Sequence, residues 1–146
     1  MLELEFNQGG RSGLSSLLIK KLARLISREL AIKKSLKISA ALVNAPAMKK
    51  LNTLYRHRPK VTDVLAFPFG QPGHQVDEAV IGEVIICYEQ AAKQAKAAGH
   101  AVRREIVFLL IHGILHLFDF DHMKPKEAAE MFTLQERILN KFFQTL

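Results

Sequence analysis

The sequence predicts one domain of the mixed α+β class that spans residues 1–146, with a mixed sheet of about four strands packed against helices. Two observations predict this class. Strand-like and helix-like segments follow each other along the chain in the rough order βαβαββααα. One helix-like segment, 101–118, is apolar on almost every side, and a helix of that kind is buried at the centre of a fold.

The first part of the chain alternates between strands and helices. Residues 2–6 alternate apolar and acidic side chains, as in a half-buried strand. Residues 14–32 repeat leucine and isoleucine every three or four positions, which is the pattern of an amphipathic helix. The apolar run 36–43 indicates a second strand, and residues 45–55 indicate a short helix.

Two further strands follow a basic turn at 56–60. Residues 61–69 are rich in β-branched and aromatic side chains, and Pro68 near their end places this strand at an edge or a strand exit. Residues 79–88 form the other strand, in which Gly82 indicates a bulge or the close approach of another part of the chain.

The last part of the chain is helical. Residues 89–99 are strong helix formers closed by Gly99, and residues 125–144 are amphipathic. Between them, the apolar helix at 101–118 carries an HxxxH pair. We therefore expect the helix with this pair to lie in the core.

The composition is that of a globular protein without a membrane span or a disulfide. Apolar residues make up 49% and charged residues 24%, and no apolar run reaches the roughly 18 residues that a membrane span needs. The N-terminal residues do not resemble a signal peptide, and the single cysteine, Cys87, excludes an internal disulfide and a CxxC zinc site. We therefore expect a cytoplasmic protein with no membrane partner.

Positive charge is concentrated in the first 60 residues. They contain 13 Lys/Arg and 3 Asp/Glu, a net charge of +10, whereas residues 61–146 carry −3. A basic half of this kind favours a polyanionic partner such as nucleic acid, although the cations at 20–28 also fit a solvated helix face. The candidate phosphate contacts are Lys20, Lys21, Arg24, Arg28, Lys49, Lys50, Arg56, Arg58 and Lys60.

Three histidines lie at the end of the apolar helix and just beyond it: His112, His116 and His122. Residues four apart lie on one face of a helix, so the first two point the same way, and His122 can return over them in the following turn. Three nitrogen ligands with an open fourth position are typical of catalytic zinc. The other histidines are expected to be ordinary surface or core residues: His57, His74 and His100.

The residue after the first histidine is Gly113. The spacing resembles the HExxHxxGxxH motif of zinc proteases, in which a glutamate at this position is the general base. Glycine cannot move a proton, so the pattern predicts metal binding without peptide hydrolysis. The missing side chain also predicts space beside the metal for a bulky substrate group such as a phosphate with its sugar.

Three blocks of the sequence resemble the YbeY family of bacterial endoribonucleases. "HGILHLFDFDH" (112–122) is similar to its H-G-x-L-H-L-x-G-Y-D-H signature, "LNTLYRHRPKVTDVLAFPF" (51–69) to its L-N-x-x-Y-R…T-D-V-L-S-F-P segment and "IGEVIIC" (81–87) to its G-D-I-x-I-C strand. The resemblance covers about residues 36–145. Asp119 stands at a glycine position that suits a positive φ, which aspartate tolerates better than most residues. Three further positions depart from the pattern: Ala66, Glu83 and Phe120.

The resemblance implies a zincin-like fold with one metal ion, usually zinc, held by His112, His116 and His122; nickel is a credible substitute. It implies cleavage of single-stranded RNA in rRNA processing, chiefly at the 3′ end of 16S rRNA, and a role in ribosome quality control. The expected partners are the small ribosomal subunit, a ribosomal protein and a ribosome-assembly GTPase.

The resemblance also assigns roles to two further side chains. Arg56 matches the family's Y-R arginine, and a guanidinium can grip a phosphate through two hydrogen bonds and stabilise charge in the transition state. Asp121 precedes a ligand and is expected to orient an imidazole through a hydrogen bond. No residue stands out as a general base, so attack by water and attack by the RNA 2′-hydroxyl both remain open.

Two other functions remain open at this point. One is a metallohydrolase that acts on another class of substrate, although Gly113 speaks against a peptidase. The other is a non-catalytic ribosome-assembly factor with a structural metal. The basic N-terminal half supports the endoribonuclease and the assembly factor alike.

Overall fold

The computed structural model describes residues 1–7, 9–69, 80–119 and 124–144. The strands are β1 (Leu2–Asn7), β2 (Leu36–Val43), β3 (Val64–Pro68) and β4 (Val80–Cys87). The helices are a short 3₁₀ helix, η1 (Gly9–Ser12), and α1 (Ser16–Glu29), α2 (Ala45–Arg56), α3 (Tyr88–Ala98), α4 (Val102–Leu117) and α5 (Pro125–Gln144). Apart from η1, this is the predicted order. None of the helices in the described part of the chain is both long and apolar enough to cross a membrane.

Two elements begin at least two residues later than the sequence predicts, because side chains bond to the backbone at their starts. The hydroxyl of Ser15 accepts a backbone N–H of the first turn of α1, so the helix begins after it. The Val64 N–H donates to Oδ1 of Asp63 at 2.8 Å, and β3 begins there instead of at residue 61. Contacts of this kind depend on single residues, so the periodicity of apolar residues does not predict where they form.

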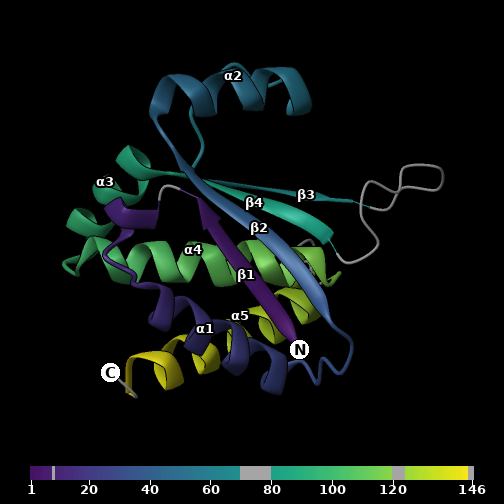
Figure 1. Cartoon of the computed structure of the whole chain (residues 1–146). Helices are drawn as coiled ribbons and strands as arrows, with labels where there is room; N and C mark the ends of the chain where they lie inside the picture. Colours follow the sequence, from purple (N-terminus) through teal and green to yellow (C-terminus); the bar gives the residue numbers. More distant parts are fainter. Residues whose placement is uncertain (8, 70–79, 120–123, 145–146) are drawn as a thin grey trace.

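The strands form one mixed sheet in the order β1-β2-β4-β3, and the expectation of about four strands is confirmed. Strands β1, β2 and β4 are parallel, whereas β3 is antiparallel to β4 and lies at an edge (Figure 1). Pro68 is the last residue of β3, which confirms its expected edge position, because proline has no N–H to donate to a further strand.

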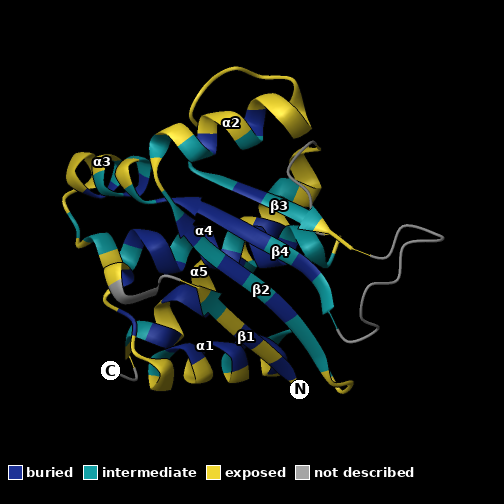
Figure 2. Ribbon diagram, turned by 45° about the horizontal axis from the view of Figure 1, so that its top comes forward, coloured by how far each residue is buried: buried dark blue, intermediate teal, exposed yellow. Residues whose placement is uncertain are grey.

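The two faces of the sheet have different covers. Helices α1, α4 and α5 lie on one face, here called the α4 face, and α2 lies on the other, the α2 face (Figure 1). Side chains alternate between the faces along each strand, so Val84 and Ile86 join the large core under α4, whereas Ile85 and Cys87 join a small cluster under α2. Figure 2 shows the consequence: α4 is largely buried, whereas α2 is mostly exposed.

Helix α4 is the central helix that the sequence predicts. Nine of its 16 residues are buried, and it packs against β3, β4, α3 and α5. Its C-terminal end approaches the sheet so closely that a Cβ on Gly82 would lie 2.7 Å from Cδ2 of Leu117. The close approach expected at Gly82 is therefore confirmed, and its partner is the helix that carries the histidines.

Candidate functional site

Two of the three candidate metal ligands lie together on α4. His112 and His116 are one turn apart, and both side chains are half-buried. Their Nε2 atoms are 3.1 Å apart, and their rings are nearly perpendicular, with 4.6 Å between the ring centroids. Phe108, one turn earlier, stacks on His112 with 6.5 Å between the centroids. Helical spacing has therefore brought the two ε nitrogens to one point.

The distance between these nitrogens fits a shared cation. Two nitrogen ligands of a tetrahedral zinc ion, each about 2.0–2.1 Å from the metal, lie roughly 3.3 Å apart. Two lone pairs that face each other repel, so a contact of 3.1 Å requires a proton or a cation between the nitrogens. His112 and His116 therefore fit as two nitrogen ligands of one metal ion.

A residue of α5 contacts the far side of the first histidine. Oε1 of Gln135, which is fully buried, lies 3.1 Å from Nδ1 of His112. Sequence reasoning missed Gln135, although the sequence contained a signal. It is the polar member of an otherwise apolar stripe along α5 that comprises Met131, Gln135, Ile138, Leu139 and Phe142.

The third candidate ligand, His122, lies outside the described residues, as does Asp121. The structure does describe the turn that leads toward them. Asp119 has a φ of 67°, and its N–H donates to the carbonyl of His116 at 3.1 Å. Asp119 therefore adopts the left-handed conformation that suits the glycine of the family pattern. Within residues 1–7, 9–69, 80–119 and 124–144, no group of three or more His, Cys, Asp or Glu side chains is placed to hold a metal.

Gly113, the residue after the first histidine, faces the sheet, and its contacts there explain why it is a glycine. A Cβ at this position would lie 2.6 Å from Cγ1 of Val84 and 3.4 Å from Cγ2 of Val64. Carbon atoms in contact are normally about 3.5–4.0 Å apart, so the close packing of α4 on β4 requires the glycine, whereas the approach to Val64 of β3 is an ordinary contact. The prediction of substrate space at Gly113 is wrong, because the sheet fills that space.

Arg56 ends α2, and its exposed side chain reaches the edge of the sheet. Its Nη2 donates to the carbonyl of Ala66 at 3.0 Å, and its guanidinium carbon lies 5.7 Å from the centre of the Phe67 ring. On either side of Ala66, backbone groups of Asp63 and Phe69 form hydrogen bonds with β4. In an antiparallel pair, only every second residue bonds to the neighbouring strand, so the Ala66 carbonyl points away from β4, to the free edge of β3. A guanidinium has five N–H donors, so this bond leaves others for a phosphate.

The candidate RNA-contact residues fall on two exposed surfaces. The α1 surface comprises Lys20, Lys21, Arg24 and Arg28, and the α2 surface comprises Lys49, Lys50, Arg56, Arg58 and Lys60. Helices α1 and α2 lie on opposite faces of the sheet (Figure 1). A short, straight segment of RNA therefore cannot contact both surfaces.

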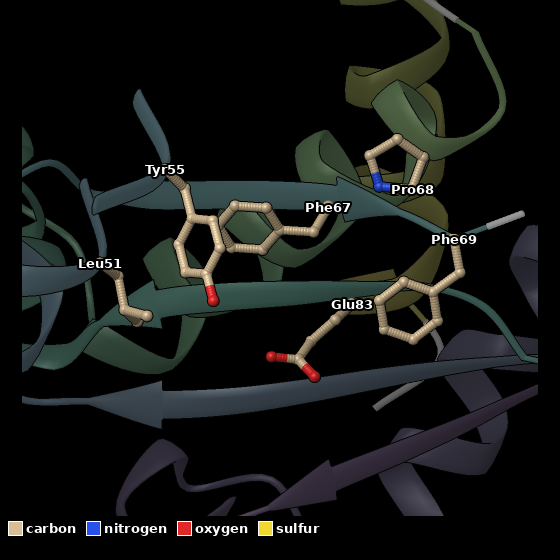
Figure 3. Close-up of a pocket in the computed structure, with 6 residues that line it drawn as sticks. All are labelled: Leu51, Tyr55, Phe67, Pro68, Phe69 and Glu83. Carbon is tan, nitrogen blue, oxygen red and sulfur yellow. The ribbon is translucent and has the colours of Figure 1, made fainter. Parts of the chain in front are cut away.

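The α2 face also contains a groove that sequence reasoning did not find. Leu51 and Tyr55 of α2 lie across from Phe67, Phe69 and Glu83 of the sheet, around a hollow of about 310 Å³ (Figure 3). The rings of Tyr55 and Phe67 meet edge to face at 5.3 Å. Because α4 packs on the opposite face, the thickness of the sheet separates this groove from the two histidines.

The remaining described histidines lie away from the HxxxH pair in the sequence and are an exposed residue and one with a local partner. His57 caps the C-terminal end of α2 in a left-handed conformation, with a φ of 57°, and is exposed. Nε2 of His100 lies 2.8 Å from Oε2 of Glu105, and Oε1 of the same carboxylate accepts from the Gln94 amide at 3.0 Å. His74 lies outside the described residues.

Several known proteins are similar to this chain over most of its length. The family model for endoribonuclease YbeY matches residues 11–143. An endoribonuclease YbeY from Kineococcus radiotolerans is 37% identical over 145 residues, which cover 96% of this chain and 83% of that protein. An endoribonuclease YbeY from Beutenbergia cavernae is 40% identical over 126 residues, which cover 83% of this chain and 84% of that protein.

The likeness extends to three dimensions. A solution structure of a protein from Thermotoga maritima matches this fold with a TM-score of 0.66 at 26% identity, covering 99% of this chain and 91% of that one. The family model spans most of the sequence, and the relatives exceed 30% identity along most of both chains. The chain therefore belongs to the endoribonuclease YbeY family.

Proposed function

We propose that this chain is a zinc-dependent endoribonuclease that cleaves single-stranded RNA. Membership of the YbeY family identifies the class of enzyme, an endoribonuclease. The observation that carries the metal part of the proposal is the 3.1 Å separation of the Nε2 atoms of His112 and His116 on a largely buried helix. That separation suits two ligands of one cation.

The proposed site holds one metal ion, with His122 as the third ligand. Three nitrogen ligands suit zinc, and nickel is a credible substitute. When bound, such an ion supplies Lewis-acid chemistry that polarises a phosphoryl oxygen of the substrate. Asp121, next to the third ligand in the sequence, is proposed to hold an imidazole in place through a hydrogen bond.

Arg56 is proposed to bind the phosphate at which RNA is cleaved. Its guanidinium lies at the free edge of β3, a strand on which α4 packs, and has donors beyond the one that Ala66 accepts. Paired hydrogen bonds would orient the phosphate and stabilise the negative charge that develops on it. Attack by the RNA 2′-hydroxyl would leave a cyclic phosphate and attack by water would not, so end-group analysis of the products distinguishes them.

Two features disfavour a peptidase. Gly113 has no side chain to act as a base, and its contact with Val84 leaves no room for one. A peptide that added to the free edge of β3 would need unpaired backbone groups there. Two groups of this edge are already bonded: the Val64 N–H to Asp63 and the Ala66 carbonyl to Arg56.

We further propose ribosomal RNA as the substrate, chiefly the 3′ end of 16S rRNA, together with a role in ribosome quality control. The family resemblance suggests this substrate, and the net charge of +7 supports a polyanionic one. The proposed partners are the small ribosomal subunit, a ribosomal protein and a ribosome-assembly GTPase, and the proposed location is the cytoplasm. A non-catalytic assembly factor would keep these partners and show no RNA cleavage.

The substitution His116→Ala tests the proposal. We expect it to lose RNA cleavage and about one metal ion per chain together, because it removes a ligand. His57→Asn is the matched control, since it changes an exposed histidine at the end of α2, and asparagine tolerates the left-handed backbone there.

Metal content and the cleavage of one oligonucleotide, in single-stranded and duplex form, are measured on the same samples. The control is expected to match the wild type in both measurements. A folded wild-type protein that binds no zinc, or that cleaves RNA at its full rate without metal, would contradict the proposal.

A further inference from the structure

Gln135 is a polar residue in apolar surroundings. It has no exposed surface, and the buried stripe of α5 around it includes Met131, Ile138 and Leu139. Among the described residues, its Nε2 has no hydrogen-bond partner. Burying an unpartnered amide N–H destabilises a fold, and a methionine would fill a similar space without that cost. Packing alone therefore does not account for a glutamine here.

The contact with His112 does account for it. A neutral imidazole has one N–H and one lone pair, on different nitrogens, and an amide oxygen can only accept a hydrogen bond. Oε1 of Gln135 lies 3.1 Å from Nδ1 of His112, so with its oxygen on this side the amide favours a hydrogen on Nδ1 and a lone pair on Nε2 of a neutral ring. Nε2 is also the atom 3.1 Å from Nε2 of His116. The amide thus leaves a lone pair at the point where the two rings converge.

We infer that Gln135 is a positioning residue: it holds His112 in the Nδ1–H tautomer, so that Nε2 can bind a metal. The consequence for metal binding rests on the proposed function, whereas the tautomer is a property of the chain alone. Hydrogen bonds to the second nitrogen of a ligating histidine fix its tautomer and its orientation. Helix α5, which packs against α4, would then contribute to the site without supplying a ligand.

Two substitutions separate the acceptor from the shape of the side chain. Gln135→Met removes the acceptor, and we expect its zinc dissociation constant to rise about 10–100-fold, measured by competition with a chromophoric chelator. Gln135→Glu keeps an acceptor oxygen, and we expect it to bind zinc at least as tightly as the wild type. Leu139→Ala, one turn along the same buried stripe, is the matched control that removes packing and keeps the acceptor.

Unfolding of the metal-free proteins separates positioning from packing. Metal-free Gln135→Met is expected to lose little stability, because the lost bond to His112 is offset by removal of the unpartnered Nε2. The control Leu139→Ala is expected to unfold at a lower denaturant concentration with its zinc affinity unchanged. A merely structural glutamine would behave like this control, and that result would overturn the inference.

The tautomer is measured directly by long-range ¹H–¹⁵N NMR of the imidazole rings in the metal-free wild type. We expect a hydrogen on Nδ1 of His112, and its loss from that atom in Gln135→Met. A hydrogen on Nε2 of His112 in the wild type would overturn the inference even if no variant folded. A wild type with the Nδ1–H tautomer and no zinc affinity would contradict the proposed function and leave the tautomer assignment standing.

Discussion

The two faces of the sheet differ in what they bury and in what they expose. On the α4 face, three helices pack over one large core, and the HxxxH pair projects from the helix at its centre. On the α2 face, a small cluster of Met48, Leu65, Ile85 and Cys87 holds a single helix, whose exposed side carries several cations. We therefore expect substitutions on the α4 face to change stability or metal binding, and substitutions on the α2 face to change contacts with the substrate.

Strand β3 is where the two faces meet. Val64 packs against the core of the α4 face, whereas Leu65 and Phe67 belong to the cluster under α2. Arg56 comes from α2, but its hydrogen bond is to the free edge of β3. It is therefore the residue of the α2 face that we expect to act on the reaction itself.

Replacing Arg56 by alanine should lower the rate of catalysis more than any other change that leaves the metal bound. The side chain is exposed, and its one hydrogen bond within the described part of the chain is to a backbone carbonyl, so we expect the fold and the metal content to be unchanged. Loss of one charge-stabilising contact typically costs about 2.7–4 kcal/mol of transition-state stabilisation, a drop in rate on the order of a hundredfold or more. Cleavage rates and metal content on the same samples measure it.

Two further variants sharpen this test. Arg56→Lys should restore only part of the rate, because an ammonium cannot make paired contacts with a phosphate. Arg58→Ala removes an exposed cation two residues away and should weaken substrate binding with kcat little changed. Full cleavage by Arg56→Ala with normal metal content would mean that Arg56 only bonds to the edge of β3 and does not take part in the reaction.

Replacing Gly113 by alanine should have the next largest effect, and it should change the stability of the fold instead of the reaction. Alanine is the better helix former by about 1 kcal/mol, yet its Cβ would lie 2.6 Å from Cγ1 of Val84. Overpacking of a core costs about 1–3 kcal/mol, so we expect the free energy of unfolding of the metal-free protein to fall in spite of the helix propensity. Urea unfolding of the metal-free protein measures it.

A second substitution tests the cause. Val84→Ala alone leaves a cavity and should destabilise the fold, but combined with Gly113→Ala it removes the atom that the new Cβ would meet. The pair should therefore cost less than the sum of the single changes. Unchanged or higher stability in Gly113→Ala would mean that the space at this glycine is open, as the sequence first suggested.

Much of the fold follows from local patterns in the sequence. Periodicity located the strands and helices, and the apolar character of 101–118 identified the central helix. Pro68 indicated the edge strand and Gly82 the close approach of another element. These predictions succeeded because each depends on the residues of one segment and on a rule for that segment.

Long-range packing accounts for what the sequence did not predict. Spacing showed that His112 and His116 share a face of a helix, but not that Gly113 meets Val84 on another face. Gln135 contacts His112 from 23 residues away, and only the packing of α5 on α4 makes the two neighbours. The fold class likewise did not say which face of the sheet α1 or α2 would cover. The sequence therefore could not divide the candidate RNA contacts between two surfaces.

The smallest predicted effect compares the two basic surfaces with each other. We propose that RNA bound at Arg56 continues along the α2 surface, because the α1 surface lies on the other face of the sheet (Figure 1). The double substitution Arg58→Glu with Lys60→Glu should therefore weaken binding of single-stranded RNA to the metal-free protein. Lys20→Glu with Arg24→Glu makes the same change in charge on α1 and should weaken it much less.

The salt dependence of binding distinguishes lost phosphate contacts from a general change in charge. Each phosphate contact with a single strand contributes about 0.7 to the slope of log K against log salt, so loss of two contacts should lower the slope by roughly 1.4. The α1 pair has the same net charge as the α2 pair, so a general charge effect would lower the affinity of both variants equally. Equal losses with equally reduced slopes would mean that the RNA wraps around both faces of the sheet. A loss confined to the α1 pair would mean that the substrate approaches from the α4 face, and Arg56 would then be reached around the edge of β3.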